Sequence, residues 1–371
     1  MYKAFGIVNS ARRNVYVDGL QDYRPIGAFS FLGRYRVIDF PISNLSNSDI
    51  ERIQVYTCNR PRSLVEHIGT GRHYNINSKN GKLQILFPND NINNNYNTDI
   101  CTYLYNMEFI EKMHFPYVVI VPSYMIYKVD FRKLLNQHVE SGADITLLYH
   151  HVDNANEAYL PCRYLNLNNQ KGVTSLSPNI GTAKNRDIFM DTYIMSKDLF
   201  VELVHKAKHE SSMYMLSDIV NLSCETLDVR GVAHHGFFAS ITDFKSYFEA
   251  NMALLDNPPA ADNLFQDDWP IYTRTNDSAP TQYYEDADVS KCAVANGCHI
   301  EGKIFNSVIG RGCTIEKGAV VENSIVLAGT TITENTHVAY QVIDKNAKLV
   351  HMKEIISTAA DPGYVRKNDK L

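Results

Sequence analysis

Short apolar runs alternate with amphipathic segments over the first two thirds of the chain. The runs Ala4–Val8, Tyr117–Val121 and Ile145–Tyr149 are short and continuous, as the buried strands of a largely parallel sheet are. In Cys101–His114 and Asp130–Ser141, apolar residues recur at a spacing of three and four, which predicts helices that each bury one face. Alternation of this kind favours an α/β sheet with helices on both of its faces.

Three further segments extend this pattern to about residue 256. We predict a strand over Ile53–Thr57 and helices over Lys197–Lys208 and Ile241–Leu255. The fold class is therefore α/β, with a Rossmann-like domain over residues 1–256 whose sheet is mixed and mostly parallel.

Ligands of such sheets bind beyond the carboxyl ends of the strands. We therefore expect functional side chains at Asn9–Arg13, at Pro122–Met125 and around Ser240, because each of these places follows a predicted strand.

Two stretches interrupt the alternation. Pro88–Asp99 is polar and rich in asparagine, which is typical of a surface loop. Residues 257–288 show no clear periodicity and contain four prolines. We predict that this second stretch connects two domains.

A six-residue repeat dominates the C-terminal part of the chain. Ile309, Ile315 and Val321 are six residues apart. After a phase shift of one residue, the same step is continued by Val320, Val326, Ile332 and Val338. One aliphatic residue in every six, with small residues between, is the signature of a hexapeptide β-helix, whose coils bury a core only when they stack. We predict a left-handed parallel β-helix over residues 289–371.

Composition and charge exclude several classes of protein. The chain has 371 residues, of which 44% are hydrophobic and 21% charged, as in an ordinary globular protein. The net charge of −5 argues against a broad nucleic-acid-binding surface. No apolar run reaches about 18 residues, and no signal peptide is recognisable, so we expect no membrane span. Seven scattered cysteines without a C-x-x-C pair indicate reduced thiols, and we expect a cytoplasmic protein.

Six short motifs occur in order along the chain. They are Gly33–Phe40 (GRYRVIDF), Ser43–Ser48 (SNLSNS), Ser63–Ile68 (SLVEHI), Tyr127–Asp130 (YKVD), His138–Asp144 (HVESGAD) and Ser246–Met252 (SYFEANM). Together they resemble the motifs of the glucose-1-phosphate adenylyltransferases of bacterial glycogen synthesis. The resemblance implies a nucleotidyltransferase domain followed by a hexapeptide helix. It also implies a reaction in which ATP and glucose 1-phosphate give ADP-glucose and pyrophosphate, with Mg²⁺ and cationic side chains neutralising charge.

The phosphate and metal positions of such an enzyme are altered in this chain. The glycine-rich turn after the first strand, which lets N–H groups close around phosphates, reads Asn9-Ser10-Ala11-Arg12-Arg13. The two positions at which the resemblance places metal-binding carboxylates are Tyr124 and Ser240. Neutral hydroxyl groups are poor Mg²⁺ ligands, so we expect this chain to hold no metal of its own.

The positions that would bind the substrates depart from the family as well. The two phosphate-binding lysines are replaced by Ile26 and Ser177. In the sugar site, a glycine and a serine become Asp191 and Phe189, and a carboxylate there would repel a sugar phosphate. The segment that faces adenine, G-T-A-D in the family, reads Thr98–Cys101. Several losses within one set of residues should lower activity by many powers of ten.

Three interpretations of these departures are open. The first is a regulatory, catalytically deficient subunit that assembles with a catalytic homologue, in an expected tetramer in which only the catalytic partner requires Mg²⁺. The second is a weak or altered nucleotidyltransferase that uses other carboxylates, namely Asp39, Asp90, Asp99, Asp218 and Asp243. The third is a sensor that binds sugar phosphate or nucleotide without chemistry. We interpret Asp243 as a residue of a first helical turn rather than as a ligand.

Basic residues near the first motif are candidates for regulation. Arg24, Arg34 and Arg36 suit bidentate contacts to phosphate, and the resemblance implies phosphorylated effectors in this region. The alternative is that these arginines pair with Asp22, Asp39 or a neighbouring subunit. Gly310-Arg311-Gly312 resembles a phosphate loop, but the six-residue repeat already accounts for its glycines.

Histidines give weaker signals. Hexapeptide acyltransferases use a histidine, for which His299 and His337 would be the candidates, but no long loop projects from the repeat, and we expect both to face solvent. His150-His151 and His234-His235 do not form metal pairs, because adjacent residues of a strand point to opposite faces.

Overall fold

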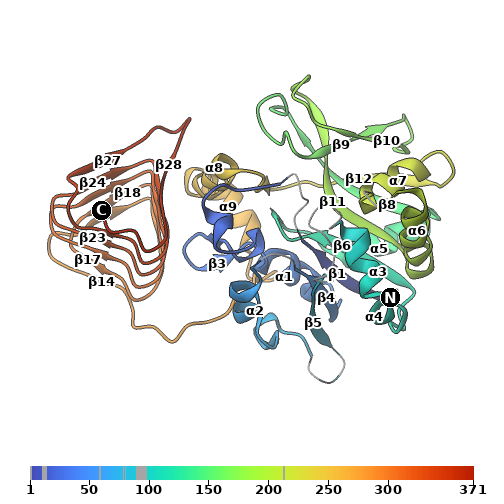
Figure 1. Ribbon diagram of the computed structural model, residues 1–371, viewed down its shortest axis with the longest axis horizontal. Coiled ribbons are helices and arrows are strands. Elements are labelled where there is room, and N and C mark those ends of the chain that lie inside the picture. The colour runs from blue at the N-terminus through green and yellow to red at the C-terminus, as the bar shows by residue number, and fades with distance from the viewer. Residues whose placement is uncertain are drawn as a thin grey trace.

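The computed structural model describes residues 2–10, 15–57, 60–77, 79, 81–88, 98–211 and 214–371. Figure 1 shows two bodies side by side, an α/β domain that contains the N-terminus and a three-sided column of strands that ends the chain. These are the two fold types predicted from the sequence.

The central sheet of the α/β domain combines parallel and antiparallel strands. In spatial order its strands are β10 (Val173–Pro178), β9 (Arg163–Leu167), β11 (Arg186–Ser196), β6 (Tyr117–Pro122), β1 (Ala4–Asn9), β4 (Arg52–Tyr56) and β5 (Lys82–Leu86), while β8 (Ile145–Val152) pairs with β11 and with β12 (Val229–Ala233). β1 runs parallel to β4 and β6, whereas β11 runs antiparallel to β6, β8 and β9. The predicted mixed sheet is confirmed.

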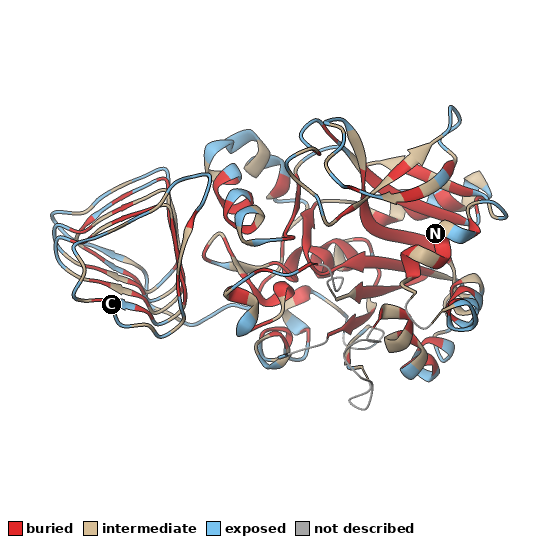
Figure 2. Cartoon of the chain, turned by 45° about the horizontal axis from the view of Figure 1, so that its top comes forward, coloured by how far each residue is buried: buried red, intermediate tan, exposed pale blue. Residues whose placement is uncertain are grey.

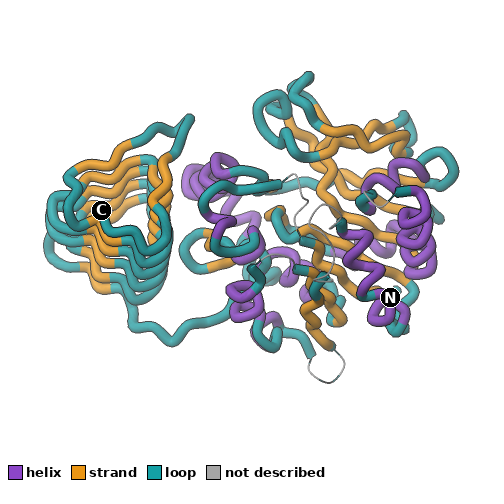
Figure 3. Tube along the Cα trace, viewed as in Figure 1, coloured by secondary structure: helices purple, strands orange, loops and turns teal. Residues whose placement is uncertain are grey.

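Helices cover both faces of this sheet (Figure 3). One face carries α1 (Asp39–Asn47), α2 (Arg62–Ile68), α5 (Phe131–Ser141) and α8 (Phe244–Asp256); the other carries α3 (Asp99–Tyr105), α4 (Met107–Glu111), α6 (Lys197–Glu210) and α7 (Leu216–Ser223). Side chains of β1 alternate between the two cores: Val8 packs with the first set and Ile7 with the second. Figure 2 shows the middle strands buried along nearly their whole length.

Short elements connect these layers. They are the 3₁₀ turns η1 (Leu20–Asp22), η2 (Ile26–Ala28) and η3 (Arg72–Tyr74), and the two-stranded pairs β2 (Ser30–Phe31) with β3 (Tyr35–Arg36) and β7 (Met125–Tyr127) with β13 (Phe238–Ser240).

Two predicted helices differ from the observed ones. The single helix expected over Cys101–His114 is divided into α3 and α4 at Asn106, whose Nδ2 donates to the carbonyl groups of Thr102 and Phe87. The helix expected from Ile241 begins only at Phe244, because Asp243 caps it: Asp243 Oδ1 accepts a hydrogen bond from the Ser246 amide at 2.8 Å.

Residues 257–288 contain regular structure. Helix α9 (Pro258–Leu264) begins with proline, which is favourable in a first turn because no N–H is needed there. The first strand of the column, β14 (Gln282–Tyr283), also lies within this stretch.

The column consists of three parallel five-stranded sheets. The first contains β14, β17 (His299–Ile300), β20 (Thr314–Ile315), β23 (Thr331–Ile332) and β26 (Lys348–Leu349). The second contains β15 (Asp288–Ser290), β18 (Lys303–Phe305), β21 (Val320–Glu322), β24 (His337–Ala339) and β27 (Glu354–Ile356). The third contains β16 (Ala293–Val294), β19 (Val308–Ile309), β22 (Ile325–Val326), β25 (Gln341–Ile343) and β28 (Gly363–Val365).

Inward side chains stack in columns, as a hexapeptide helix requires. One column contains Ile309, Val326 and Ile343, which recur every 17 residues. In the two coils that join these residues, one side uses five residues instead of six, which explains the phase shift in the sequence. Val320 is not an inward residue as the repeat suggested; Val321 points inward and is fully buried.

The third sheet of the column faces the α/β domain. Val308, Ile325 and Val342, which point outward from the column, belong to the same buried cluster as the side chains of α1 and α8. The two bodies thus share one apolar interface. Within the described residues, no helix is both long enough and apolar enough to cross a membrane.

Candidate functional site

The carboxyl ends of β1 and β6 lie side by side, where Asn9 pairs with Pro122. Side chains from four further segments close around this point, and the lining consists of Asn9, Ser10, Asp99, Pro122, Tyr124, Asp191, Tyr193 and Ser217. The sequence correctly placed Asn9 and the segment after β6 here. The space left between these residues is about 10 Å³, close to the minimum that holds one water molecule.

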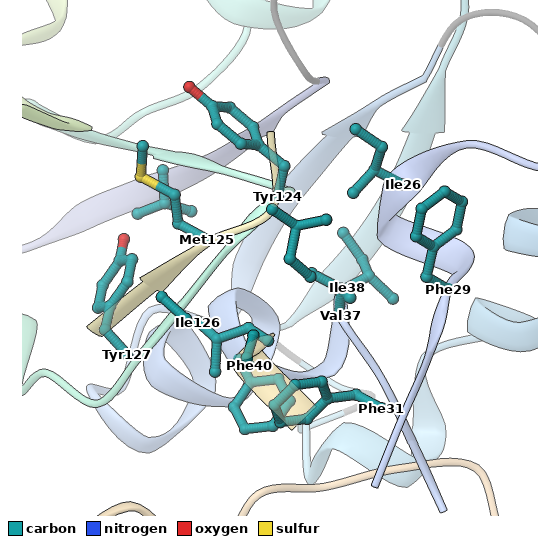
Figure 4. Packing of buried hydrophobic residues seen from close by; sticks show 14 of the residues in the cluster. Ile26, Phe29, Phe31, Val37, Ile38, Phe40, Tyr124, Met125, Ile126 and Tyr127 are labelled. Atoms are coloured by element: carbon teal, nitrogen blue, oxygen red, sulfur yellow. The ribbon is translucent and has the colours of Figure 1, made fainter. Parts of the chain in front are cut away.

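Tyr124 lies buried at the end of β6. Its side chain is 1% exposed, and its hydroxyl donates a hydrogen bond to Asp191 Oδ2. Figure 4 shows the ring beside Ile26 and Ile38, with the hydroxyl pointing away from these apolar side chains. The ring is thus held by packing at one end and by a carboxylate at the other.

Asp191 lies where β11 is irregular. The pairing register between β11 and β8 shifts between Phe189 and Tyr193, and Asp191 within this bulge has a φ of +45°. This is the left-handed region that favours glycine. The Asp191 carboxylate accepts a hydrogen bond from the Tyr124 hydroxyl.

Asp99 is the second carboxylate in the lining. It accepts hydrogen bonds from the backbone amides of Ile100 and Leu216 and from Asn9 Nδ2. These contacts tie the start of α3 to the start of α7 and to the end of β1. Both carboxylates in the lining are therefore engaged within the protein.

The arginine candidates lie at the boundary between the two bodies. Arg24 is 2% exposed and forms an ion pair with Asp344, with Nη2 2.6 and 2.5 Å from the two carboxylate oxygens. Within the chain, the observed partner is neither Asp22 nor Asp39, the two that the sequence suggested. Arg24 Nη1 is buried and has no hydrogen-bond partner among the described residues.

Six cationic side chains gather around this boundary. We call them the interdomain basic cluster, and they are Arg24, Arg34, Arg36, Arg311, Lys345 and Lys367. Burial lowers the pKa of Arg36, and the nearby Arg24 and Arg311 lower it further against the opposing effect of Asp39. Burial, followed by the charges of Arg36 and Arg24, lowers the pKa of Lys345 to about 7. Unneutralised positive charge in a half-buried place favours an anion.

Three members of this cluster escaped prediction. Arg311, Lys345 and Lys367 lie far from Arg24 in sequence and come from the column. The only signal was the stretch around Arg311, whose glycines the repeat explained but whose arginine it did not.

Comparisons with known proteins agree with this architecture. The nucleotidyl transferase family matches residues 22–257, and a GlmU-like C-terminal hexapeptide family matches residues 279–361. A glucose-1-phosphate adenylyltransferase of Clostridioides difficile (strain 630) is 30% identical over 81% of this chain and 78% of its own length. The chain belongs to the glucose-1-phosphate adenylyltransferase family of nucleotidyl transferases.

Members with another name are also similar to it. The glycogen biosynthesis protein GlgD of Bacillus subtilis (strain 168) is 26% identical over 98% of this chain and 95% of its own length. GlgD of Geobacillus stearothermophilus is 28% identical over 86% of this chain and 83% of its own length.

Three other positions altered relative to the family were predicted from the sequence, and they do not form a metal or phosphate site. Ser240 is buried, pairs with Met125 in the β13–β7 ladder, and has its Oγ 3.5 Å from Cys162 Sγ. Ile26 packs in the apolar core at η2, and Ser177 Oγ accepts from Asn166 Nδ2 in the β9–β10 hairpin. None of Ser240, Ile26 and Ser177 lines the space around Tyr124.

Mg²⁺ does not fit the residues that the adenylyltransferase family would use. It requires near-octahedral oxygen ligands and keeps several waters. Here a phenol and a serine hydroxyl stand at the two ligand positions, and the space holds about one water.

The carboxylates of the altered-enzyme interpretation have structural roles where they are described. Asp39 is fully buried and accepts from the Arg36 amide, His67 Nε2 and Tyr74 Oη. Asp218 caps α7 and pairs with Arg163, and Asp243 caps α8. Asp90, like Ala11–Arg13 of the first turn, lies outside the described residues.

Histidines do not supply a metal centre either. His150 and His234 face each other, with their Nδ1 atoms 3.2 Å apart, while burial lowers the pKa of His234 to about 4. Within the described part of the chain, no group of three or more histidine, cysteine, aspartate or glutamate side chains is placed to hold a metal. His299 and His337 lie on outer faces of the column, beside Tyr284 and Glu322.

Proposed function

We propose that this chain is a regulatory, catalytically deficient subunit of glucose-1-phosphate adenylyltransferase, acting in the cytoplasm in complex with a catalytic homologue. One observation carries the proposal: neither family metal position offers a carboxylate, and both carboxylates nearby are engaged by protein donors. Without a cation the charge of the reacting phosphates stays unneutralised, which removes the main source of catalysis in phosphoryl transfer.

The parts of the family architecture that this chain keeps are those that subunit assembly and regulation would use. The motif Gly33–Phe40 is intact and runs from β3 into α1, beside the boundary between the two bodies. The column supplies a second surface. Its last coil is covered by the chain's own end, because the Leu371 carbonyl accepts from the amides of Val350 and His351.

The first coil of the column has no such cover among the described residues. β14, β15 and β16 are each the edge strand of their sheet, and Tyr283, in line with the buried Ile300, is 55% exposed. Strand edges around an apolar end are suited to pair with the end of another hexapeptide coil. We propose that the catalytic homologue contributes that coil.

The interdomain basic cluster is the proposed site for a phosphorylated effector. Among the described residues, the buried carboxylates beside its six cations are Asp39 and Asp344, and Arg24 Nη1 lacks a partner there. An anion bound there would touch both bodies, so it would favour one relative arrangement over others. Thermal denaturation with pyrophosphate as the probe should show stabilisation that the R34A/R36A variant lacks.

The decisive experiment compares the chain alone, the catalytic homologue alone and the two co-expressed. Pyrophosphate release is measured with ATP, glucose 1-phosphate and Mg²⁺, and the size of each species by light scattering. We expect the chain alone to be slower than the homologue by at least about 10³-fold, as for loss of several cooperating residues. We expect the co-expressed pair to form one complex with a changed rate or effector response.

Other results would select the other interpretations. Turnover by the isolated chain at the rate of an ordinary adenylyltransferase would establish an enzyme and refute the proposal. Ligand-induced stabilisation without any association would identify a sensor.

A further inference from the structure

Two altered family positions are occupied by side chains that bind each other. Tyr124 replaces a metal-binding carboxylate and Asp191 replaces a sugar-site glycine, and the Tyr124 hydroxyl donates to Asp191 Oδ2. The two residues come from different parts of the sheet, after β6 and within β11, yet they line the same small space.

We propose that the Tyr124–Asp191 pair is a built-in occupant of the former substrate site, which excludes sugar phosphates and sugar nucleotides from it. This inference rests on the proposed function only in taking the site as unused for catalysis. It adds that the site is closed by the protein's own side chains, and not merely deprived of ligands for a metal.

The tyrosine is fixed in place at three points. Its carbonyl accepts from the Ile241 amide at 2.9 Å, which joins it to β13. Its ring is 1% exposed within the apolar cluster that includes Ile26 and Ile38 (Figure 4). Its hydroxyl is held by Asp191. Leaving the site would expose the ring and break a charge-assisted hydrogen bond in a buried setting, so admission of a ligand by side-chain rotation is unfavourable.

The backbone at Asp191 has a conformation that glycine adopts more readily than aspartate. A non-glycine residue at a φ of +45° is strained, and glycine would relieve this strain. Asp191 is nonetheless 8% exposed, and its carboxylate lies on the buried tyrosine. The hydrogen bond from the Tyr124 hydroxyl is one interaction that offsets the strain.

The space enclosed by the lining residues beside the pair is about the size that holds one solvent molecule. About 10 Å³ is left between the lining residues, and Ser217 Oγ, in the same lining, is buried without a partner among the described residues. One water there would give Ser217 a partner. A hexose phosphate is many times larger.

The test measures binding in the full-length protein by calorimetry, with glucose 1-phosphate and ADP-glucose as probes and without Mg²⁺. Five proteins are compared: wild type, Asp191→Gly, the double variant Tyr124→Ala/Asp191→Gly, Asp191→Asn and Tyr127→Phe. The asparagine keeps an acceptor for the tyrosine hydroxyl, so this variant is the matched control in which the occupant stays. Tyr127→Phe, which removes the buried hydroxyl paired with Thr192, controls for loss of a neighbouring tyrosine hydroxyl.

We expect no binding to wild type, Asp191→Asn or Tyr127→Phe. For the double variant we expect a dissociation constant for ADP-glucose at least about tenfold below the weakest binding that the same measurement could detect for wild type. Should the double variant not fold, Asp191→Gly serves alone, because glycine suits the backbone at this position. Binding to wild type, or equal absence of binding in wild type and in every folded opened variant, would overturn the proposal.

This outcome is separable from that of the assembly experiment. A chain that fails to associate with a catalytic homologue but gains ligand binding on opening would retain the built-in occupant and lose the regulatory role. A chain that associates with the homologue but binds ADP-glucose as wild type would keep the regulatory role and lose the built-in occupant.

Discussion

The pKa of Lys345 is changed by its position between the α/β domain and the column. Lys345 follows Asp344 on the last coil and is half-buried beside Arg24, Arg36 and Lys367. Burial and then these cations lower its pKa from 10.5 to about 7, while Asp344 opposes the shift. Near neutral pH this lysine is therefore partly uncharged, and an anion bound in the cluster would favour its protonated form.

We predict that Lys345 makes the free energy of unfolding depend on pH between about 7 and 10.5. The unfolded chain binds more protons than the folded chain over this window, because the folded pKa is the lower one. Stability should therefore rise with pH there. The variant Lys345→Met removes this effect. Its stability relative to wild type should be greatest at or below pH 7 and should fall by at most about 1.4 kcal/mol per pH unit above it.

Urea unfolding of wild type, Lys345→Met and the exposed control Lys348→Met at pH 7, 8 and 9 measures this. Parallel pH profiles for wild type and Lys345→Met would contradict the assignment. The control should follow wild type, because Lys348 lies on an outer face of the column.

At the scale of elements, capping decides where α8 begins and what Asp243 does. Asp243 Oδ1 accepts from the Ser246 amide, and Ser246 Oγ accepts from the Asp243 amide, which forms a reciprocal cap. The sequence placed Asp243 at this helix start, but it began the helix at Ile241 because apolar spacing continues through that residue. A helix boundary depends on which side chain satisfies the first amides, and spacing alone does not show this.

We predict that Asp243→Ala lowers the free energy of unfolding by about 1 kcal/mol, because the Ser246 amide of the first turn loses its partner. Asp243→Asn should retain most of the cap, since an amide oxygen also accepts from a backbone N–H. Urea denaturation followed by circular dichroism measures both. If Asp243 were instead a replacement metal ligand, the asparagine variant would change Mg²⁺-dependent turnover of the chain and leave its stability unchanged.

The sequence predicted the elements whose pattern is local. Continuous apolar runs marked β1, β6 and β8, and the aliphatic repeat marked the column. It missed the antiparallel β9 and β10, in which exposed and buried residues alternate in short, irregular runs broken by a register shift near Val173. It also took the five-residue side of the coils that join Ile309, Val326 and Ile343 for a phase shift, because one repeat length was assumed for all three sides.

The candidate site was predictable only in part, because a sequence pattern shows local features and not contacts between distant residues. Tyr124, Ser240, Ile26 and Ser177 were named because the resemblance places each at a family position, and of these Tyr124 lines the space at the end of β6. The bond between Tyr124 and Asp191 joins residues 67 apart, and the partner of Arg24 lies 320 residues away. Such pairs depend on how the whole chain folds, and no spacing in the sequence encodes them.

At the scale of the whole molecule, the uncovered end of the column is the proposed contact with the catalytic subunit. We predict that Tyr283→Glu weakens association with the catalytic homologue by at least about tenfold, because it places a charge at the apolar end of a strand edge. Size-exclusion chromatography with light scattering, over a dilution series, measures this.

The exposed Tyr105, on α3 of the other body, supplies the control. Tyr105→Glu should leave association unchanged. Equal weakening by both variants would mean that general surface charge, and not this end of the column, controls assembly.

The ion pair between Arg24 and Asp344 joins the two bodies at their interface. Asp344 is fully buried and also accepts from the Lys345 amide and from Tyr364 Oη, so its loss leaves an uncompensated guanidinium and two unsatisfied donors. We predict that Asp344→Ala lowers the free energy of unfolding by about 3–5 kcal/mol. Arg24→Met alone should cost a similar amount, because it leaves the carboxylate buried without its cation.

The double variant Arg24→Met/Asp344→Leu should be more stable than either single variant, because replacing a whole buried pair by apolar side chains is often close to neutral. Urea unfolding gives the coupling energy, and proteolysis at the exposed residues 274–277 of the connection reports whether the column separates from the α/β domain. In the exposed pair Arg230–Asp228, Asp228→Ala should cost less than about 1 kcal/mol. Additive losses at Arg24 and Asp344 would mean that the pair does not hold the two bodies together, and that the apolar contact of Val308, Ile325 and Val342 alone does so.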